Sequence, residues 1–405
     1  MVTLDDIRQA RERIAGAVDV TPCIEPYALS ELCGADLRLK LETLQRTGSF
    51  KARGAVNTLR SLTPEERDRG VIASSAGNHA QGVAYAAAIT GAGATIVMPR
   101  TTPLIKIDRT RDLGAEVVLH GDGFDEAYDH ARQIQEERGL TFIHAFDDDR
   151  VIAGQGTLGL ELLEQVPDLE AVVVPVGGGG LLSGIALAVK ALRPEVALYG
   201  VQTEAAPALE RSFRQGSLVQ RVEGRRSLAD GIAIKRPVER TYRILRQHVD
   251  DLRLVTEEEI ETGIFHLLET GKVIAEGAGA AGVAALLAGR FPELDGKRTA
   301  VVVCGANIDL NVLGRIIERS LARQGRMVQL RITIRDQPGG LAALLRRLAD
   351  LEANVVRVHH DRVFVRASFW EVHVHVALET KSAGHVGEIL AALEGSGYGK
   401  VEALR

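Results

Sequence analysis

The chain has 405 residues, of which 45% are apolar and 25% are charged, and its formal net charge at pH 7 is −5. This is an ordinary composition for a globular chain of two or three domains, and it excludes a disordered or fibrous protein. The net negative charge leaves no basic footprint for nucleic acid, so we expect no nucleic-acid partner.

The first 150 residues predict strands that alternate with helices. Apolar spacing predicts a helix over Leu4–Val18, and alternating residues predict a strand over Asp36–Leu41. Further strands are expected over Val71–Ala73, Ala94–Met98 and Glu116–His120, and further helices over Ala80–Ile89, Leu104–Leu113 and Phe124–Arg138. Short strands that alternate with helices indicate parallel βαβ units and an α/β fold.

A second series of the same kind follows residue 147. Strands are predicted over Ala171–Val176, Leu198–Val201 and Thr299–Val303. Helices are predicted over Gly156–Gln165, Leu181–Leu192, Glu257–Leu268, Ala278–Ala288 and Asn307–Arg323. The segment Arg211–Ile234 is polar and irregular, so we expect a loop there.

The pattern changes at Gln324–Arg326 to a smaller, self-contained unit. Strands are predicted over Val328–Ile334, Val355–His359, Glu371–Leu378 and Val401–Ala403, and helices over Leu341–Leu351 and Val386–Leu393. This order is βαββαβ. We therefore expect an α/β region over 1–323, with a small subdomain at about 49–146 inserted in a larger one, and a separate domain over 327–405.

One lysine stands in a turn rich in glycine and hydroxyl groups, Thr47–Ala55, at the predicted start of a helix. Lys51 can be a nucleophile if burial keeps its amine available near neutral pH. Taken alone, Lys51 and Arg53 are more simply explained as two solvated charges in the first turn of a surface helix. The other motifs of the chain change this interpretation.

Four consecutive glycines, Gly177–Gly180, follow an apolar strand and precede a helix that begins near Leu181. Such a loop lets main-chain N–H groups close around an anion, and the helix N-terminus adds favourable charge, so a phosphate is the expected ligand. The spacing matches neither the dinucleotide nor the nucleoside-triphosphate fingerprint. The simpler alternative is a flexible turn between strand and helix.

Two further motifs stand where a predicted strand ends. Ser74–Gly82 offers hydroxyls, an amide and the donors of a helix N-terminus, which suit a carboxylate, although a plain N-cap would look the same. Cys304 ends the Thr299–Val303 strand, and strand ends of open α/β sheets bind ligands. A lone cysteine there is more often a small core residue.

In this order, the motifs Ser49–Ala55, Ser74–Gly82, Gly177–Leu181, Glu276–Gly279 and Cys304–Asp309 resemble the threonine dehydratases (threonine ammonia-lyases). These are pyridoxal-phosphate enzymes of the tryptophan-synthase-β fold type, and the resemblance covers about residues 1–323. It implies two open three-layer α/β domains. The C-terminal unit resembles an ACT regulatory domain of ferredoxin-like fold through Asp336–Leu341.

The resemblance implies that Lys51 carries the cofactor on its amine and takes the Cα proton of the substrate as general base. Phe50 would flank the pyridine ring, and Asn78 would hydrogen-bond the ring hydroxyl. The phosphate would lie against Gly177, Gly178, Gly179, Gly180 and Leu181. Cys304 would lie against the ring nitrogen, where relatives often have serine. The substrate carboxylate would be held by Ser75, Asn78 and His79.

The choice among related activities depends on Ala76. Serine racemases of this fold type have a serine at this place that exchanges a proton on the second face of the substrate. Ala76 has no such proton, so the resemblance implies deamination of threonine, and of serine as well, with weak racemisation. A non-catalytic sensor of pyridoxal phosphate or amino acids is the alternative from another class. Retention of Lys51 together with the glycine loop argues against it.

Two weaker sites follow from the same resemblance. Glu204, Ala208 and Glu210 have the spacing of a divalent-cation site in some relatives, although solvated acids explain them equally well. The ACT-like domain would bind an amino acid, isoleucine or valine first, between paired modules and so regulate the enzyme in isoleucine biosynthesis. A purely structural role in forming a dimer or tetramer stays open.

Three cysteines, Cys23, Cys33 and Cys304, are too few and too scattered for a disulfide framework or a metal cluster. Residues 1–15 mix charged and apolar residues without the apolar run of a signal peptide, and no stretch is long and apolar enough to span a membrane. We therefore expect a cytoplasmic protein.

Overall fold

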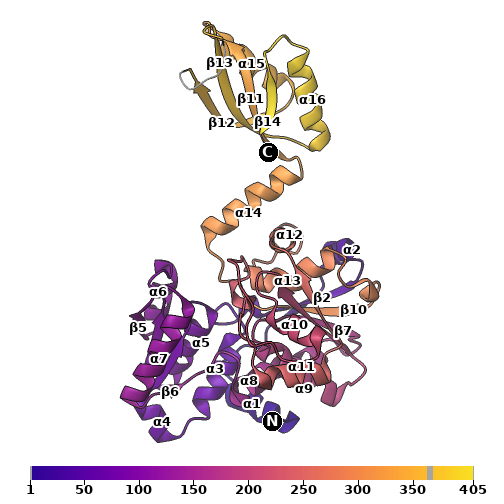
Figure 1. The fold of residues 1–405 in the computed structure, drawn as a ribbon. Helices are drawn as coiled ribbons and strands as arrows, with labels where there is room; N and C mark the ends of the chain where they lie inside the picture. Colours follow the sequence, from indigo (N-terminus) through magenta and orange to yellow (C-terminus); the bar gives the residue numbers. More distant parts are fainter. Residues whose placement is uncertain (1, 363–367, 405) are drawn as a thin grey trace. The chain divides into compact units, whose positions relative to one another are not determined.

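The structure is a computed structural model that describes residues 2–362 and 368–404, and the chain forms two compact units, Met1–Ile308 and Asp309–Arg405 (Figure 1). The first unit contains a six-stranded and a four-stranded sheet, and the second contains another four-stranded sheet. Helices alternate with most of the strands along the chain. This confirms the predicted α/β class with an additional small domain. No helix of the described residues is both long and apolar enough to cross a membrane.

The smaller sheet of the first unit is parallel, with the order β5-β4-β3-β6. Its strands are β3 (Val71–Ser74), β4 (Ala94–Met98), β5 (Glu116–Leu119) and β6 (Thr141–Phe142). The helices of this part are α4 (Pro64–Arg69), α5 (Asn78–Thr90), α6 (Leu104–Asp112) and α7 (Phe124–Arg138) (Figure 1). Every residue of β3 and β4 is buried, because helices cover both faces of a parallel sheet.

The larger sheet has the order β1-β2-β10-β7-β8-β9, and all pairs except β1 with β2 are parallel. Its strands are β1 (Cys23–Ile24), β2 (Asp36–Leu41), β7 (Ala171–Pro175), β8 (Ala197–Thr203), β9 (Asp251–Val255) and β10 (Arg298–Val303). The helices of this part are α1 (Leu4–Ile14), α2 (Tyr27–Cys33), α8 (Asp149–Gln165), α9 (Gly180–Leu192), α10 (Ala208–Gln215), α11 (Glu239–His248), α12 (Glu257–Glu269) and α13 (Gly277–Leu287). Helix α3 (Lys51–Arg60) shares an apolar core with β3 and β4 of the smaller sheet and with α5.

Helix α8 packs closely on α3, and glycines make this possible. A Cβ atom at Gly154 would lie 2.7 Å from the carbonyl oxygen of Arg53, and one at Gly156 would lie 2.9 Å from the carbonyl oxygen of Gly184 in α9. The helix begins at Asp149 rather than at the predicted Gly156, because the Asp148 side chain accepts a hydrogen bond from the Arg150 N–H at 2.7 Å. The glycines that weaken the sequence signal are those that bring the helices together.

The prediction of a loop over Arg211–Ile234 is wrong at its N-terminal end. Helix α10 begins after Pro207 and ends at Gln215, followed by Gly216, which is left-handed with φ 72°. The helix buries Ala208, Leu209 and Ser212 on one side. Two buried apolar residues in eight are too weak a pattern to indicate a helix, and α11 and β9 were likewise not predicted.

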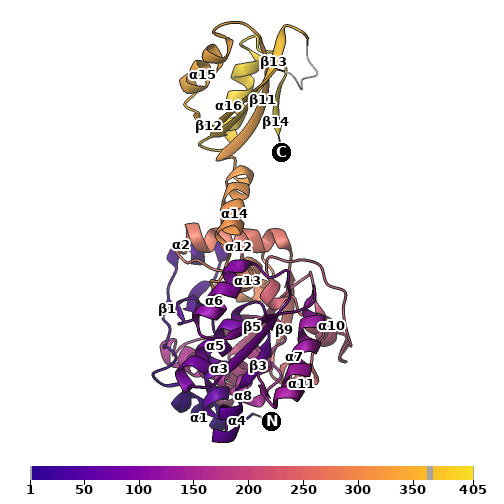
Figure 2. The same cartoon turned by 90° about the vertical axis from the view of Figure 1, so that its left-hand side faces the viewer.

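The second unit begins with α14 (Leu310–Arg323), capped by Asp309, whose side chain accepts a hydrogen bond from the Asn311 N–H. Its antiparallel sheet has the order β12-β13-β11-β14. The remaining elements are β11 (Met327–Arg335), α15 (Gly340–Asp350), β12 (Asn354–Asp361), β13 (Glu371–Glu379), α16 (Ala383–Glu394) and β14 (Val401–Leu404). Helices α15 and α16 lie beside the sheet (Figure 2). Their side chains share one apolar core with it, including Leu344, Ile389 and Val374. This is the predicted βαββαβ order.

Candidate active site

The turn before Lys51 is held against the end of strand β10. The Phe50 N–H donates to the carbonyl oxygen of Cys304 at 3.0 Å, and the Ala306 N–H donates to the carbonyl oxygen of Gly48 at 2.9 Å. Gly48 is left-handed with φ 70°, which suits glycine at this tight position. Helix α3 then begins at Lys51, so the lysine lies at the carboxyl end of the larger sheet.

The Lys51 side chain is half-buried, and its amine has one hydrogen-bond acceptor among the described residues. Its Nζ donates to the carbonyl oxygen of Ala145 at 3.0 Å and lies 5.0 Å from the centre of the Phe50 ring. Burial lowers the pKa of Lys51 to about 8, although nearby Cys304 and Glu276 act in the opposite direction. An amine with this pKa is partly neutral near physiological pH and is therefore a competent nucleophile and base.

The glycine loop joins β7 to α9, and none of its four glycines has room for a side chain. A Cβ at Gly177 would lie 2.8 Å from the carbonyl oxygen of Gly231, one at Gly180 would lie 2.9 Å from the Cβ of Phe146, and one at Gly178 would overlap the Phe146 ring. Gly179 is left-handed with φ 89°. The Thr241 hydroxyl donates to the Gly178 carbonyl oxygen at 2.8 Å and holds the loop in this shape.

The main-chain N–H groups of the glycine loop remain free to bind a ligand. Within residues 2–362 and 368–404, no protein oxygen accepts a hydrogen bond from the main-chain N–H groups of Gly178, Gly179 or Gly180. Leu181 follows in the first turn of α9, where the positive end of the helix dipole lies. Free N–H groups at a helix N-terminus form a cradle for a phosphate.

The segment predicted to hold a carboxylate lies between β3 and α5. The Ser75 hydroxyl accepts a hydrogen bond from the Gly77 N–H at 3.2 Å, and α5 begins at Asn78. The His79 Nε2 lies 2.8 Å from the carbonyl oxygen of Ile143, and burial lowers the pKa of its ring to about 3. The neutral ring is thus hydrogen-bonded to the main chain of Ile143. The main-chain N–H of His79 is the group that remains for a ligand.

Two residues to which the sequence analysis assigned no role, Glu276 and Asn307, hold the two ends of the Asn78 side-chain amide. Its Nδ2 donates to Glu276 Oε1 at 2.6 Å, and its Oδ1 accepts from Asn307 Nδ2 at 2.7 Å. Glu276 belongs to the motif Glu276–Gly279 and Asn307 to the motif Cys304–Asp309, and Glu276 is the only acid in its run of glycine and alanine. A single acid in such an apolar run is the sequence signal that could have indicated a functional role for Glu276.

Cys304 lies directly after β10 and is buried, with 3% of its surface exposed. Burial raises the pKa of its thiol far above the usual range, with a further contribution from Glu276. The thiol is therefore uncharged. A neutral group at this place cannot act on a ring nitrogen as a carboxylate would.

Among the residues of the predicted cation site, Glu204 directly follows β8, and Ala208 and Glu210 lie in the first turn of α10. Glu204 is exposed, the Ala208 carbonyl oxygen accepts a hydrogen bond from the Ser212 hydroxyl at 2.7 Å, and Glu210 pairs with Arg214 at 3.1 Å. In the part of the chain that the structure describes, no three His, Cys, Asp or Glu side chains form a metal-binding group. The cation site stays a prediction.

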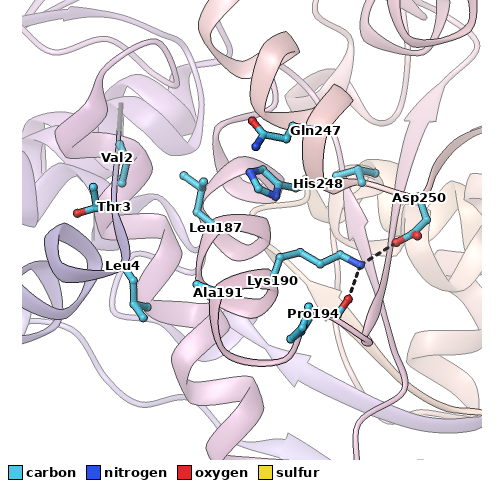
Figure 3. Close-up of a pocket in the computed structure, with 11 residues that line it drawn as sticks. Val2, Thr3, Leu4, Leu187, Lys190, Ala191, Pro194, Gln247, His248 and Asp250 are labelled. Carbon is cyan, nitrogen blue, oxygen red and sulfur yellow. Dashed lines mark hydrogen bonds and ion pairs between the residues drawn. The ribbon is translucent and has the colours of Figure 1, made fainter.

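A cavity of about 520 Å³ lies elsewhere in the first unit (Figure 3). It lies between the N-terminal segment, α9 and the end of α11, and the Lys190 amine on its wall donates to the oxygens of Val196 at 2.8 Å and Asp250 at 3.2 Å. None of the site residues described above lines this cavity. It is therefore separate from the candidate active site.

Comparison with known proteins gives the class of the chain. Residues 14–305 match the family model described as pyridoxal-phosphate dependent enzyme. The chain belongs to this family.

The particular branch follows from the most similar relatives. The chain is 50% identical over 398 residues to the L-threonine ammonia-lyase of Thermotoga maritima, covering 98% of both chains, and so belongs to the threonine ammonia-lyase family. Among solved structures, threonine deaminase isoform 2 from Solanum lycopersicum is 38% identical with a TM-score of 0.73, covering 78% of this chain and 93% of that one. Maize serine racemase is 33% identical with a TM-score of 0.75, covering 80% and 98%. The fold type that the sequence resembles is confirmed.

The described residues fit pyridoxal phosphate. The Lys51 amine, with its lowered pKa, suits its aldehyde, and the free N–H groups of Gly178–Gly180 suit its phosphate. The Asn78 Nδ2 keeps a second hydrogen for an oxygen of the ring. The roles of the individual residues toward the cofactor stay predictions.

The Gly178→Ala variant should bind pyridoxal phosphate at least about 10-fold more weakly, because the new methyl group overlaps the Phe146 ring and displaces the loop at a cost of about 1–3 kcal/mol. Absorbance titration of the apo-protein with the cofactor measures this. Gly93→Ala is the matched control, since nothing lies within 4 Å of its Cβ. Equal affinity in both variants would argue against a phosphate at this loop.

Proposed function

We propose that the protein deaminates L-threonine to 2-oxobutanoate and ammonia and also acts on L-serine. The observation that carries this proposal is that Lys51 Nζ donates to the Ala145 carbonyl oxygen, while the next residue, Phe146, packs against the glycine loop with its free donors. The chain that holds them is 50% identical to an L-threonine ammonia-lyase along almost its whole length. This makes the substrate an amino acid with a hydroxyl group on Cβ.

The residues of the site divide the work. Bound pyridoxal phosphate supplies the electron sink that acidifies the substrate Cα proton. Lys51 Nζ, oriented by the Ala145 carbonyl oxygen, accepts that proton. The main-chain donors at the start of α5 hold the substrate carboxylate through dipoles rather than an ion pair.

The neutral thiol of Cys304 limits how strongly the ring can withdraw electrons. It offers no negative charge to keep a ring nitrogen protonated. A weaker electron sink suits a reaction in which the β-hydroxyl leaves with, or soon after, the Cα proton. The released enamine tautomerises and hydrolyses in water to the 2-oxo acid and ammonia.

The direct test is to incubate the purified protein with pyridoxal phosphate and L-threonine. We expect a near-visible absorption band that shifts when threonine is added, followed by release of 2-oxobutanoate. A shift of the band without product would instead support a non-catalytic sensor. No product from threonine or serine would overturn the proposed activity.

The Ala76→Ser variant should form D-serine from L-serine at least about 10-fold faster than the wild type, because the new hydroxyl offers a proton on the second face of the substrate. Chiral chromatography of the reaction mixture measures the D-serine. Ala191→Ser, on an exposed part of the surface, is the control. A wild-type D-serine yield comparable to its pyruvate yield would favour a racemase.

For Asp309–Arg405 we propose a regulatory, ACT-like role between paired copies of the chain. The support is its βαββαβ order and its own apolar core. Isoleucine or valine should change the threonine concentration at half-maximal rate by about 5-fold or more, the usual size of an allosteric coupling. Initial rates over a titration of each amino acid, with leucine as comparison, measure this. Unchanged rates and cooperativity would leave a structural role.

A further inference from the structure

Three polar side chains from distant segments form a continuous hydrogen-bonded chain in the candidate site. Asn307 Nδ2 donates to the Thr47 carbonyl oxygen at 2.8 Å and to Asn78 Oδ1 at 2.7 Å. Asn78 Nδ2 in turn donates to Glu276 Oε1 at 2.6 Å. Glu276 lies against the main chain after Cys304, where its own N–H donates to the Gly305 carbonyl oxygen at 3.0 Å.

The direction of this chain follows from one main-chain group. A carbonyl oxygen only accepts hydrogen bonds, so the amide end of Asn307 that faces Thr47 must be its nitrogen. The same nitrogen faces Asn78, which must therefore present its oxygen to Asn307 and its nitrogen to Glu276. One hydrogen of the Asn78 amide nitrogen then remains for a ligand oxygen.

We propose that Asn307 and Glu276 are positioning residues that hold the Asn78 amide with its N–H toward the bound ligand, and that the charge on Glu276 sets the strength of that interaction. This inference rests on the proposed function, because the ligand oxygen belongs to pyridoxal phosphate. Asn78 touches the ligand, and the two other residues act through it.

The surroundings of Glu276 make its charge change near neutral pH. Burial raises the pKa of its carboxyl to about 7, Asp230 acts in the same direction, and Asn78, Lys106 and Lys51 oppose them. The titratable thiol of Cys304 also faces it and stays uncharged. Below about pH 7 the carboxyl is mainly protonated, and above it the carboxylate pulls more strongly on the Asn78 N–H. That carboxylate also raises the pKa of Lys51.

The Glu276→Gln variant separates charge from shape. Its side-chain oxygen still accepts from Asn78, but it cannot lose a proton. We expect the pH profile of kcat/KM for threonine to lose the ionisation with a pKa near 7 that Glu276 contributes in the wild type. We also expect the rate at which apo-protein captures pyridoxal phosphate to reach half its maximum at a lower pH. The reason is that the negative charge of Glu276, which raises the pKa of Lys51, is absent from the variant.

Glu195→Gln, at an exposed pair with Arg193, is the matched control and should leave both profiles unchanged. Wild-type profiles in Glu276→Gln would overturn the proposal. Capture of the cofactor requires no turnover, so its pH profile tests this inference even if threonine is not the substrate. Absence of product from the wild type would instead count against the proposed function alone.

The Asn307→Asp variant tests the orientation of Asn78. It replaces the donor Nδ2 of Asn307 by a carboxylate oxygen, which only accepts hydrogen bonds. Its carboxylate would face the oxygens of Thr47 and Asn78. We expect about a 10- to 100-fold loss of affinity for pyridoxal phosphate, because the Asn78 amide is no longer held with its nitrogen toward the ligand. The melting temperature of the apo-protein is measured in parallel. Unchanged cofactor affinity would contradict the role of Asn307.

Discussion

Replacing Lys51 by alanine is expected to lower the rate of threonine deamination by about 10⁴-fold or more. The variant loses both the amine that carries the cofactor and the base that accepts the Cα proton. Lys51 Nζ reaches its position from the first turn of α3 and is held there by the Ala145 carbonyl oxygen. Release of 2-oxobutanoate measures the rate. Mass spectrometry after borohydride reduction shows whether the cofactor is still attached.

The control is Lys297→Ala, which removes an exposed lysine of the same unit. It should keep the wild-type rate and the covalently attached cofactor. If Lys51→Ala deaminated threonine at a rate close to that of the wild type, the assigned base would be wrong. If Lys51→Ala lost activity but still gave the reduced adduct, another lysine would have to carry the cofactor.

Much of the α/β region was predictable because its strands are short, apolar and bounded by clear breaks. The strands Asp36–Leu41 and Ala94–Met98 and the helix Phe124–Arg138 have the predicted bounds. The glycine loop was also visible, because four glycines after a buried strand are an unusual pattern with one strong physical use. These features depend on local sequence.

The rest of the site depends on contacts between distant segments. Glu276 and Asn307 act through Asn78, and no local pattern indicates that these three side chains meet. Arg53 is the clearest case. The sequence favoured a solvated charge in a first helical turn, but the structure buries this side chain completely. Its partners come from α8 and from the segment directly after β2, so only the tertiary packing of α3 brings them into reach.

Arg53 lies at the centre of a buried cluster of two cations and two carboxylates. Its guanidinium makes two hydrogen bonds to Glu42, at 2.7 and 2.8 Å, and two to Glu161, at 2.6 and 2.9 Å. Lys40 also donates to Glu161, at 2.6 Å, and to the Thr21 carbonyl oxygen at 2.7 Å. The cluster ties the first turn of α3, which carries Lys51, to α8 and to the end of β2.

Replacing Arg53 by alanine should lower the free energy of unfolding by about 3–5 kcal/mol, because it leaves buried carboxylates without their partner. Arg53→Lys should lie between the alanine variant and the wild type, since it keeps the charge but cannot make paired hydrogen bonds. Arg8→Ala is the control, because the Arg8–Asp5 pair is exposed and worth about 0–1 kcal/mol. Urea denaturation followed by circular dichroism measures all three.

The pH dependence distinguishes a lost charge partner from lost packing. Burial alone would raise the pKa of Glu42, but the Arg53 guanidinium and its hydrogen bonds hold it below the usual value of 4.5. A folded-state pKa below the unfolded value stabilises the protein above about pH 4.5, and this contribution is lost as the pH falls. The difference in stability between the wild type and Arg53→Ala should therefore shrink from pH 7 to pH 4. A difference that does not change with pH would mean that Arg53 acts through packing alone.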